Sequence, residues 1–342
     1  MNVDLRSDTV TKPTKEMLDY MLQAKVGDDV FMEDPTVNEL EMYAAKLFDK
    51  EAGLFCPSGT MTNQIAIKVH TNPPGELICD VDSHIYKYEG GGIAFNSGLS
   101  ARLLQGERGR LTLDQIIPFL NPDDVHMPPT QLISLENTCN RGGGSIYAYE
   151  EMKKIGDWCK ANHLKFHLDG ARIFNAIVEA DYSAIDIGNL FDTISICLSK
   201  GLGAPVGSVL VGDKTTIKKA RRIRKIFGGG MRQAGIIAAA GLYALKNNIG
   251  RLKQDHQRAK TLGEAFSNLN WVEKVYPVDT NIVVVQVKNN VNEHEVINQL
   301  AEKNIKTIYF GPKLIRLVTH LDVKDEHINY VLETVKRLNI SC

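Results

Sequence analysis

The middle of the chain reads Phe166-His167-Leu168-Asp169-Gly170-Ala171-Arg172. Its apolar start predicts a buried strand, with Asp169 at the end of that strand and a basic residue shortly after it. The stretch Ile194-Ser-Ile-Cys-Leu-Ser-Lys200 repeats this arrangement, because Lys200 ends an apolar run and precedes a glycine-rich turn. Parallel sheets bind ligands at the carboxyl ends of their strands, so Asp169 and Lys200 are candidate site residues.

Short apolar runs alternate with amphipathic helical stretches from about residue 50 to residue 210. This alternation predicts an α/β fold with a mainly parallel sheet that helices cover on both faces. Asp34 and Pro35 predict the start of a helix that ends before Gly53, since Asp is a good N-cap and Pro fits the first helical position. The predicted strands are 77–79, 132–135, 166–168, 193–198 and 208–211, and the predicted helices between them include 113–120 and 149–162.

The pattern changes in the last third of the chain. A long Ala-rich helix is predicted over 233–246 and onward to 269, followed by strand 281–287, helix 293–303, strands 307–310 and 314–318, and helix 324–338. These later elements predict a small α+β domain of roughly 70–90 residues. We therefore expect a large domain over residues 1–250 and a small C-terminal α+β domain over residues 251–342.

Composition excludes several classes of partner. The 342 residues include 40 basic and 41 acidic ones, so the net charge of −1 gives no footprint for nucleic acid or an anionic membrane. The longest apolar stretch, 236–245, is about half of the roughly 20 residues that a membrane helix needs. The six cysteines form no CxxC pair and the nine histidines no HExxH motif, so we expect no dedicated metal site. Reduced thiols without an export signal predict a cytoplasmic protein.

Two glycine-rich stretches resemble nucleotide-binding motifs but depart from them. Gly201-Leu-Gly203-Ala-Pro-Val-Gly207 has one residue too many before its third glycine and contains a proline, which disfavours the helix that holds a pyrophosphate. Gly207-Ser-Val-Leu-Val-Gly212 has the spacing of a P-loop, but Asp213 follows where lysine is required. Both stretches are interpreted as ordinary turns.

Four features together match the requirements of pyridoxal phosphate. Lys200 offers an amine for a Schiff base with the aldehyde, and Asp169 offers a carboxylate that keeps the pyridine nitrogen protonated. Ser58-Gly59-Thr60 precedes a helical stretch and supplies the small residues and hydroxyls that suit a phosphate. His84 is a candidate for stacking on the ring. Each feature alone has a structural explanation, as a helix cap or a solvated turn, but their joint occurrence favours the cofactor.

Several longer motifs extend this pattern over the chain. They are Asp4-Leu-Arg-Ser7-Asp-Thr-Val-Thr-Lys-Pro13, Gly27-Asp-Asp-Val30 with Glu33-Asp-Pro-Thr36, Pro57-Ser-Gly-Thr60, His84-Ile-Tyr-Lys-Tyr-Glu89, Leu135-Glu-Asn-Thr138, His167-Leu-Asp-Gly-Ala-Arg172, Leu198-Ser-Lys-Gly-Leu-Gly-Ala-Pro205, Gly228-Gly-Gly-Met-Arg-Gln233 and Arg316-Leu-Val-Thr-His320. With these motifs the sequence resembles the L-threonine aldolases, from residue 4 to about residue 323. That family belongs to the aspartate-aminotransferase-like enzymes, fold type I of the pyridoxal-phosphate enzymes.

The resemblance implies a role for each matching residue. Lys200 would carry the cofactor, Asp169 would pair with the ring nitrogen and His84 would stack on the ring. The substrate carboxylate would be held by Ser7, from an N-terminal segment 1–15 that contributes to the site, and by two arginines with forked donors. The two arginines are Arg172, which would also border the cofactor, and Arg316. The residues implied to hold the phosphate are Gly59 and Thr60, together with Ser58.

The resemblance also implies contributions from a second subunit. Lys225 and Arg232 would reach the phosphate region of a neighbour, so the expected assembly is a homotetramer, a dimer of dimers with shared active sites. His126 matches a second histidine near the substrate hydroxyl. Two departures concern the substrate side: Cys139 replaces a histidine that many members have, and Phe31-Met32 replaces Tyr-Gly.

The implied reaction is retro-aldol cleavage of L-threonine, L-allo-threonine or a related β-hydroxy-α-amino acid to glycine and an aldehyde. A base must remove the hydroxyl proton, and His84 and His126 are the candidates because imidazole titrates near neutral pH. Other fold-type I enzymes, such as an aminotransferase, a β-eliminating lyase or a racemase, would share Lys200 and Asp169. A non-catalytic oligomeric scaffold is the alternative from a different class.

Overall fold

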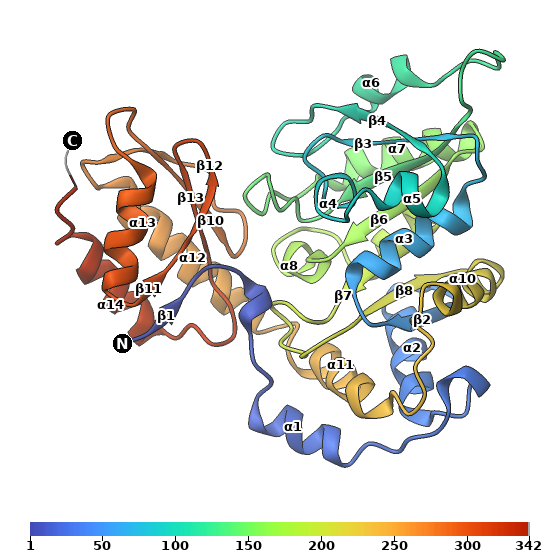
Figure 1. Cartoon of the computed structure of the whole chain (residues 1–342), viewed down its shortest axis with the longest axis horizontal. Coiled ribbons are helices and arrows are strands. Elements are labelled where there is room, and N and C mark those ends of the chain that lie inside the picture. The colour runs from blue at the N-terminus through green and yellow to red at the C-terminus, as the bar shows by residue number, and fades with distance from the viewer. Residues whose placement is uncertain (341–342) are drawn as a thin grey trace.

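A seven-stranded sheet forms the centre of the larger unit in the computed structural model, which describes residues 1–340 (Figure 1). The strands lie in the order β2-β8-β7-β6-β5-β3-β4, and β8 alone runs against its neighbours. The prediction of a mainly parallel sheet is therefore confirmed. The bounds are β2 (Ala52–Cys56), β3 (Glu76–Asp80), β4 (Ser100–Leu104), β5 (Thr130–Glu136), β6 (Lys165–Gly170), β7 (Thr193–Cys197) and β8 (Ser208–Gly212).

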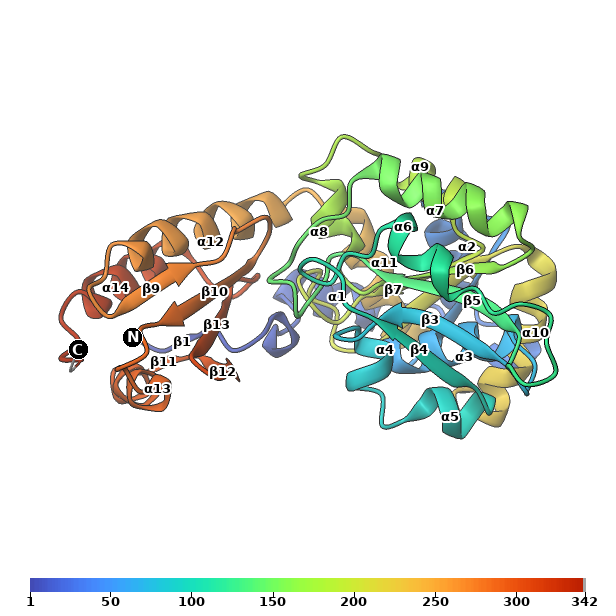
Figure 2. The ribbon, with the colours of Figure 1, turned by 90° about the horizontal axis from the view of Figure 1, so that it is seen from above.

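Helices cover both faces of this sheet (Figure 2). One face packs against α3 (Gly59–His70), α5 (Gly92–Ser97) and α10 (Lys214–Ile226), and the other against α2 (Pro35–Leu47), α7 (Tyr149–Ala161), α9 (Ala184–Leu190) and α11 (Gly235–Asn247). Burial of both faces explains why the central strands are continuous apolar runs rather than alternating ones. No helix within residues 1–340 is long and apolar enough to span a bilayer.

Local signals account for most helix boundaries. Asp34 caps α2 by accepting hydrogen bonds from the backbone N–H groups of Thr36 and Val37, and Pro35 is the first helical residue, as predicted. The helix ends at Leu47, before Gly53 as predicted, and Gly53 lies inside β2. The predicted helix 113–120 is a short α6 (Leu113–Ile116) that continues as the 3-10 turn η3 (Ile117–Phe119), because Pro118 lacks the N–H that an α-helix requires.

The predicted helix from 233 to 269 is two helices rather than one. After α11 the chain turns at residues 248–251, where Asn248 and Gly250 have poor helix propensity, and α12 (Leu252–Ser267) follows. Asn248 fixes this turn by donating from Nδ2 to the carbonyl oxygen of Leu202, 2.8 Å away. Beyond this break, α12 packs on the sheet of the smaller unit.

The smaller unit is a four-stranded antiparallel sheet with its own apolar core. The strand order is β12-β13-β10-β9, and α12 and α14 pack together beside the sheet. All five elements predicted for this region are present, and β9 was not predicted. The bounds are β9 (Val272–Val275), β10 (Ile282–Val287), α13 (Glu293–Glu302), β12 (Ile308–Gly311), β13 (Leu314–Val318) and α14 (Asp325–Val335).

The first residues of the chain belong to this smaller unit, which differs from the predicted division at residue 250. Strand β1 (Val3–Asp4) pairs in parallel with β11 (Ile305–Lys306), and the side chains of Val3 and Leu5 are buried in the core of the smaller unit. The chain then crosses to the larger unit through η1 (Asp8–Val10) and reaches α1 (Lys15–Leu22), which packs on α11 (blue in Figure 1). Residues 6–12 therefore connect the two units.

Candidate active site

A cavity of about 360 Å³ lies between the two units, at the carboxyl ends of β5, β6 and β7. The larger unit and the crossing segment contribute most of its lining, and β12 and β13 of the smaller unit close it. Several predicted site residues meet here although they lie far apart in the sequence. The predicted residues that line it are Ser7, His84, Arg172, Lys200 and Arg316, and other lining residues include Glu136, Asn140, Arg141, Tyr309 and Phe310.

Lys200 lies three residues beyond the end of β7, in a turn that the glycines make possible. Gly203 has a φ of +83° and donates its N–H to the carbonyl oxygen of Lys200 at 2.8 Å. The hydroxyl of Thr11, from the crossing segment, donates to the same carbonyl oxygen at 3.0 Å. The backbone at Lys200 is thus held from two directions, and no carboxylate in residues 1–340 forms an ion pair with its amine.

Asp169 lies at the end of β6, next to the strand that leads to Lys200. Its side chain is buried and accepts hydrogen bonds from Asn63 Nδ2 at 2.9 Å and from the backbone N–H of Ala171 at 3.1 Å. Within residues 1–340 neither Lys nor Arg pairs with this carboxylate. A buried carboxylate needs a positive partner, and a protonated ring nitrogen would supply one.

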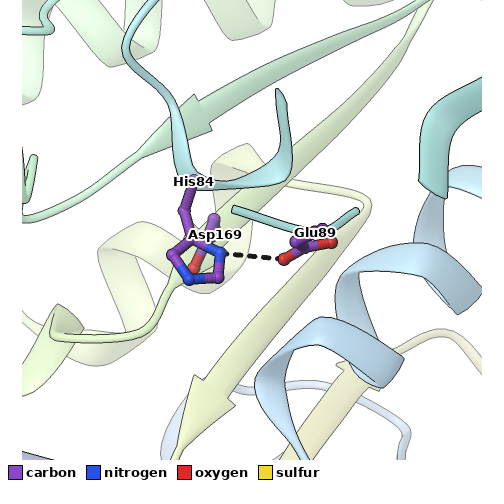
Figure 3. A group of neighbouring side chains, drawn as sticks. All are labelled: His84, Glu89 and Asp169. Atoms are coloured by element: carbon purple, nitrogen blue, oxygen red, sulfur yellow. Dashed lines mark hydrogen bonds and ion pairs between the residues drawn. The ribbon is translucent and has the colours of Figure 1, made fainter. Parts of the chain in front are cut away.

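His84 begins the short helix α4 (His84–Lys87), four residues after the end of β3 at Asp80, and lies beside Asp169 (Figure 3). Its Nδ1 is 3.0 Å from Glu89 Oε1, and its backbone N–H donates to Glu136 at 2.7 Å. Burial by itself would lower the pKa of His84, but the hydrogen bond to Glu89 and the negative charge of Asp169 outweigh it and raise that pKa.

The side chains of His84, Glu89 and Asp169 also have ligand atoms within 4.8 Å of one another, a spacing that a metal ion could use. Both oxygens of Glu89 already accept hydrogen bonds, from Asn63 at 2.9 Å and from Gln64 at 2.6 Å. These two hydrogen bonds orient the carboxylate of Glu89 toward the imidazole of His84 and leave it fewer free lone pairs for a cation. The cluster is therefore better suited to fixing His84 than to binding a metal.

Glu136 is a site residue that the sequence analysis missed. It ends β5 opposite Asp169 in the sheet register, is buried, and accepts the backbone N–H groups of His84 and Asn140, each at 2.7 Å. Burial and the charge of Asp169 raise the pKa of Glu136 to about 7. Its position after the predicted strand 132–135 was the signal that could have identified it.

Two buried arginines make one end of the cavity positive. Arg172 donates from Nε and Nη2 to both oxygens of Asp8, at 2.6 and 2.7 Å, and this carboxylate was also missed. Arg316 donates to Asn140 Oδ1 at 2.9 Å and to the carbonyl oxygen of Arg6 at 3.0 Å, while its buried Nε has no partner in residues 1–340. Burial and the charge of Arg172 lower the pKa of Arg316 to about 10. An anion from outside would complete this arrangement.

The start of α3 forms an anion cradle on the same side of the sheet. Ser58 caps this helix by accepting the N–H of Met61, and Gly59 and Thr60 form its first turn. The buried hydroxyl of Ser208 has no partner within residues 1–340 and lies 3.4 Å from the place where a Cβ at residue 59 would stand. Free backbone N–H groups, hydroxyls and a glycine that admits close approach fit a phosphate.

Comparison with known proteins places the chain among enzymes of this architecture. The family model for beta-eliminating lyases matches residues 4–290. The chain belongs to this family.

Within the family, the chain is similar to the threonine aldolases. It is 43% identical to the low specificity L-threonine aldolase of Escherichia coli K12, over 95% of this chain and 96% of that one. It is 42% identical to a probable low-specificity L-threonine aldolase of Arabidopsis thaliana, over 98% and 97% of the two chains. The structure of a threonine aldolase from Leishmania major matches with a TM-score of 0.86 at 21% identity, covering 98% of this chain and 99% of that one.

Three residues predicted from the family resemblance lie neither in the lining of the cavity nor in the cradle at the start of α3 within one chain of this family member. His126 is exposed in the loop before β5 and forms an ion pair with Asp124 at 2.8 Å. Lys225 is exposed in the last turn of α10, and Arg232 forms an exposed ion pair with Asp28 at 2.9 Å. Any role for these three side chains in catalysis therefore requires a second copy of the chain.

Asp8→Asn is expected to destabilise the protein by about 3 kcal/mol at pH 7, because it leaves the charge of buried Arg172 without its partner. Burial opposes ionisation of Asp8, but the charge and hydrogen bonds of Arg172 lower its pKa. A lowered carboxyl pKa stabilises the fold above the unfolded value of about 3.9, and this stabilisation is lost as the pH falls below that value. Urea unfolding at several pH values measures the free energy of unfolding of the wild type and of Asp8→Asn. The difference between the two should be constant from pH 8 to 5 and become smaller below pH ~4.

The exposed pair of Asp4 and Arg6 provides the control for this prediction. Asp4→Asn removes an ion pair at the surface and should change stability by less than about 1 kcal/mol. Equal unfolding midpoints for Asp8→Asn and Asp4→Asn at pH 7 would contradict the proposed importance of the buried pair.

Proposed function

We propose that this chain is a pyridoxal-phosphate-dependent lyase that cleaves L-threonine, L-allo-threonine and related β-hydroxy-α-amino acids to glycine and an aldehyde. The observation that carries the proposal is one cavity lined by Lys200 and by Arg316, whose guanidinium is incompletely paired, with the buried carboxylate of Asp169 next to the lining residue His84. The relatives named L-threonine aldolase support it over nearly the whole chain. Acetaldehyde release from each threonine diastereomer by the holoenzyme tests it directly.

The residues present fit the cofactor. Lys200 would bind its aldehyde, Asp169 would pair with its ring nitrogen and His84 would lie against its ring. The cradle of Ser58, Gly59 and Thr60, with the unpartnered hydroxyl of Ser208 beside it, would hold its phosphate. When bound, the cofactor supplies an electron sink for the carbon whose bond is broken.

The arginines would bind and orient the substrate carboxylate. Arg316 has a buried Nε donor without a partner in residues 1–340, so it is the direct ligand. The guanidinium of Arg172 is held by Asp8. We therefore assign Arg172 an electrostatic role, in which its positive charge attracts the substrate carboxylate. Ser7 lines the same cavity and can donate a hydroxyl. Anchoring the carboxylate fixes the orientation of the Cα–Cβ bond, which can contribute several kcal/mol to catalysis.

His84 is the proposed base for the β-hydroxyl proton. It lines the cavity, and Glu89 and Glu136 fix its ring and its backbone. A raised pKa makes the imidazole a stronger proton acceptor, and Glu89 stabilises the charge that forms. The role of His126 rests on the family resemblance alone and needs its loop to come from another subunit.

An aminotransferase or a β-eliminating lyase that acts on a small amino acid is the second candidate, and the family description favours the latter. Such an enzyme would use the same lysine, aspartate and arginine clamp. The threonine assay separates them, because elimination releases ammonia and a 2-oxo acid whereas aldol cleavage releases glycine and acetaldehyde.

We further propose a homotetramer with active sites shared between subunits. Large apolar side chains are exposed on the single chain, among them Phe95, Ile226 and Phe31 at 90%, 74% and 69% exposure. Ile226 is next to Lys225 in the sequence. An interface that buries the side chain of Ile226 against a second subunit would therefore also contain the amine of Lys225. In a cell we place this enzyme in the cytoplasm, where it would degrade threonine and supply glycine.

Coexpression of Lys200→Ala with Arg232→Ala tests the shared site. Each variant alone should be inactive or weakly active, but a mixed dimer contains one site with both residues intact. Random pairing should therefore restore about one quarter of the sites. Acetaldehyde release by the copurified mixture measures the recovery. A mixture no more active than its components, or a fully active monomer at nanomolar concentration, would refute sharing.

A further inference from the structure

We propose that Asn63 is a positioning residue for Asp169 and Glu89, and that a buried chain of hydrogen bonds through His167, Thr193 and His70 fixes the direction in which its amide points. The inference deepens the proposed function, on which it rests. It concerns residues that lie behind the cavity and touch neither the substrate nor the reacting atoms.

Five contacts link His70, near the amino end of β7, to the two carboxylates of the site. His70 Nε2 is 2.9 Å from the hydroxyl of Thr193, which is 2.9 Å from His167 Nδ1. His167 Nε2 is 3.2 Å from Asn63 Oδ1. The amide nitrogen of Asn63 is 2.9 Å from Asp169 Oδ2 and 2.9 Å from Glu89 Oε1.

Two helical residues and two adjacent strands supply these groups. Asn63 and His70 come from α3, the helix whose first turn forms the phosphate cradle, His167 comes from β6 and Thr193 from the start of β7. Asn63, His167 and Thr193 are buried, and His70 is half-buried. A buried polar chain of this kind is costly unless each donor meets an acceptor.

Only one direction satisfies every member of the chain when both histidines are neutral. Ionised Asp169 and Glu89 accept hydrogen bonds, so Asn63 must turn its NH₂ to them and its Oδ1 to His167. His167 must then carry its proton on Nε2, and its bare Nδ1 must accept from the hydroxyl of Thr193. That hydroxyl in turn accepts from Nε2–H of His70.

Neutral histidines are what the surroundings favour. Burial lowers the pKa of His167 and of His70 to about 4, so both rings are uncharged at pH 7. With a single proton on each ring, a change of tautomer at His167 would place a bare Nε2 against Asn63 Oδ1. The amide would then be driven to rotate, and its oxygen would face two carboxylates.

The hydroxyl of Thr193 selects between these two states. The backbone carbonyl oxygen of Thr193 lies 3.2 Å from His167 Nδ1 and would accept a hydrogen bond from Nδ1–H if the proton were on that nitrogen. Without the hydroxyl, Nδ1–H donation to that carbonyl becomes the best arrangement for His167. Loss of the hydroxyl of Thr193 would therefore change the hydrogen bonds that Asn63 makes to two carboxylates. These are Asp169, the proposed partner of the ring nitrogen, and Glu89, the partner of His84.

Thr193→Val and Thr193→Ser in the holoenzyme test this inference. Valine keeps the shape and removes the hydroxyl, so kcat for threonine cleavage should fall roughly 10- to 100-fold at full cofactor occupancy, the effect of one hydrogen bond to a charged group. Serine keeps the hydroxyl and should restore most of the activity. Ser195→Ala is the matched control, because it removes a buried hydrogen bond between the same helix and strand, to Thr62 at 2.6 Å, without touching the chain.

A second measurement does not depend on catalysis. In ¹⁵N-histidine-labelled holoenzyme at pH 7, His167 should be neutral with its proton on Nε2, and in Thr193→Val the proton should move to Nδ1. Protonated Nδ1 in the wild type, or wild-type kcat in Thr193→Val, would overturn the inference. If the wild type binds the cofactor but releases no acetaldehyde, the proposed function fails, whereas the tautomer of His167 still tests the chain.

Discussion

Replacing Lys200 with alanine is expected to reduce threonine cleavage by roughly 10⁴-fold or more, the scale on which loss of a covalent catalytic residue acts. Hydrogen bonds from Thr11 and Gly203 fix the backbone of Lys200 in the turn after β7. Its amine is therefore placed at the cavity, and no other lysine can take over this position. Acetaldehyde release measures the loss. The fold should be unaffected, because the side chain forms no ion pair within residues 1–340.

Chemical labelling checks the same assignment independently. Borohydride reduction of the holoenzyme should attach the cofactor to the peptide that contains Lys200. Lys214 and Lys225, both in α10, serve as internal controls because they are exposed and have ordinary access to solvent. Label on either of them in place of Lys200 would show that the central assignment is wrong.

His84→Asn is expected to reduce aldol cleavage by ~10²–10⁴-fold, the usual contribution of a general base. Exchange of the Cα proton of glycine should fall far less, because glycine has no hydroxyl proton to remove. Arg316→Ala is the matched variant: it removes the carboxylate ligand that both reactions need, so cleavage and exchange should fall together. Assays of both reactions on the same preparations give the comparison.

Loss of ring stacking at His84 can also weaken cofactor binding, so occupancy has to be measured beside each rate. His126→Asn, alone and combined with His84→Asn, shows whether the exposed histidine takes part in the assembled enzyme. Equal losses of cleavage and glycine exchange in the double variant at full occupancy would mean that the histidines are structural. The hydroxyl proton would then have to pass to another group, and Glu136, which also lines the cavity, is a candidate.

The sequence predicted five of the seven strands of the large sheet, because a strand covered on both faces is a continuous apolar run. It missed β2, although four of its five residues are buried. It did not predict β4, which is an edge strand whose residues are mostly half-exposed and include Arg102. It also did not predict β1 and β11, two residues each, whose pairing depends on a contact across 300 positions of sequence. Short strands without a local pattern become visible only when their partner is known.

The candidate site shows the same limit. Asp169 and Lys200 could be proposed because each ends an apolar run, His84 was proposed with them for stacking on the ring, and the longer motifs added Arg316. Asp8 and Asn63 could not be identified, because their importance lies in partners more than 100 residues away: Arg172 for Asp8, and His167 and Asp169 for Asn63. Predictions that depend on a second subunit, such as those for Lys225 and Arg232, stay predictions.

The pairing of β1 with β11 has a consequence for how the protein is made. Ribosomes add about 5–20 residues per second, so roughly 15–60 s pass between synthesis of the first strand and of its partner. During that interval Val3 and Leu5 have no core to enter, and the segment that carries Ser7 and Asp8 cannot settle between the units. A nascent chain would hold Lys200 and Asp169 in a nearly finished sheet well before its substrate pocket can close. Catalytic competence is thus gained near the end of translation, and an interrupted chain would lack it.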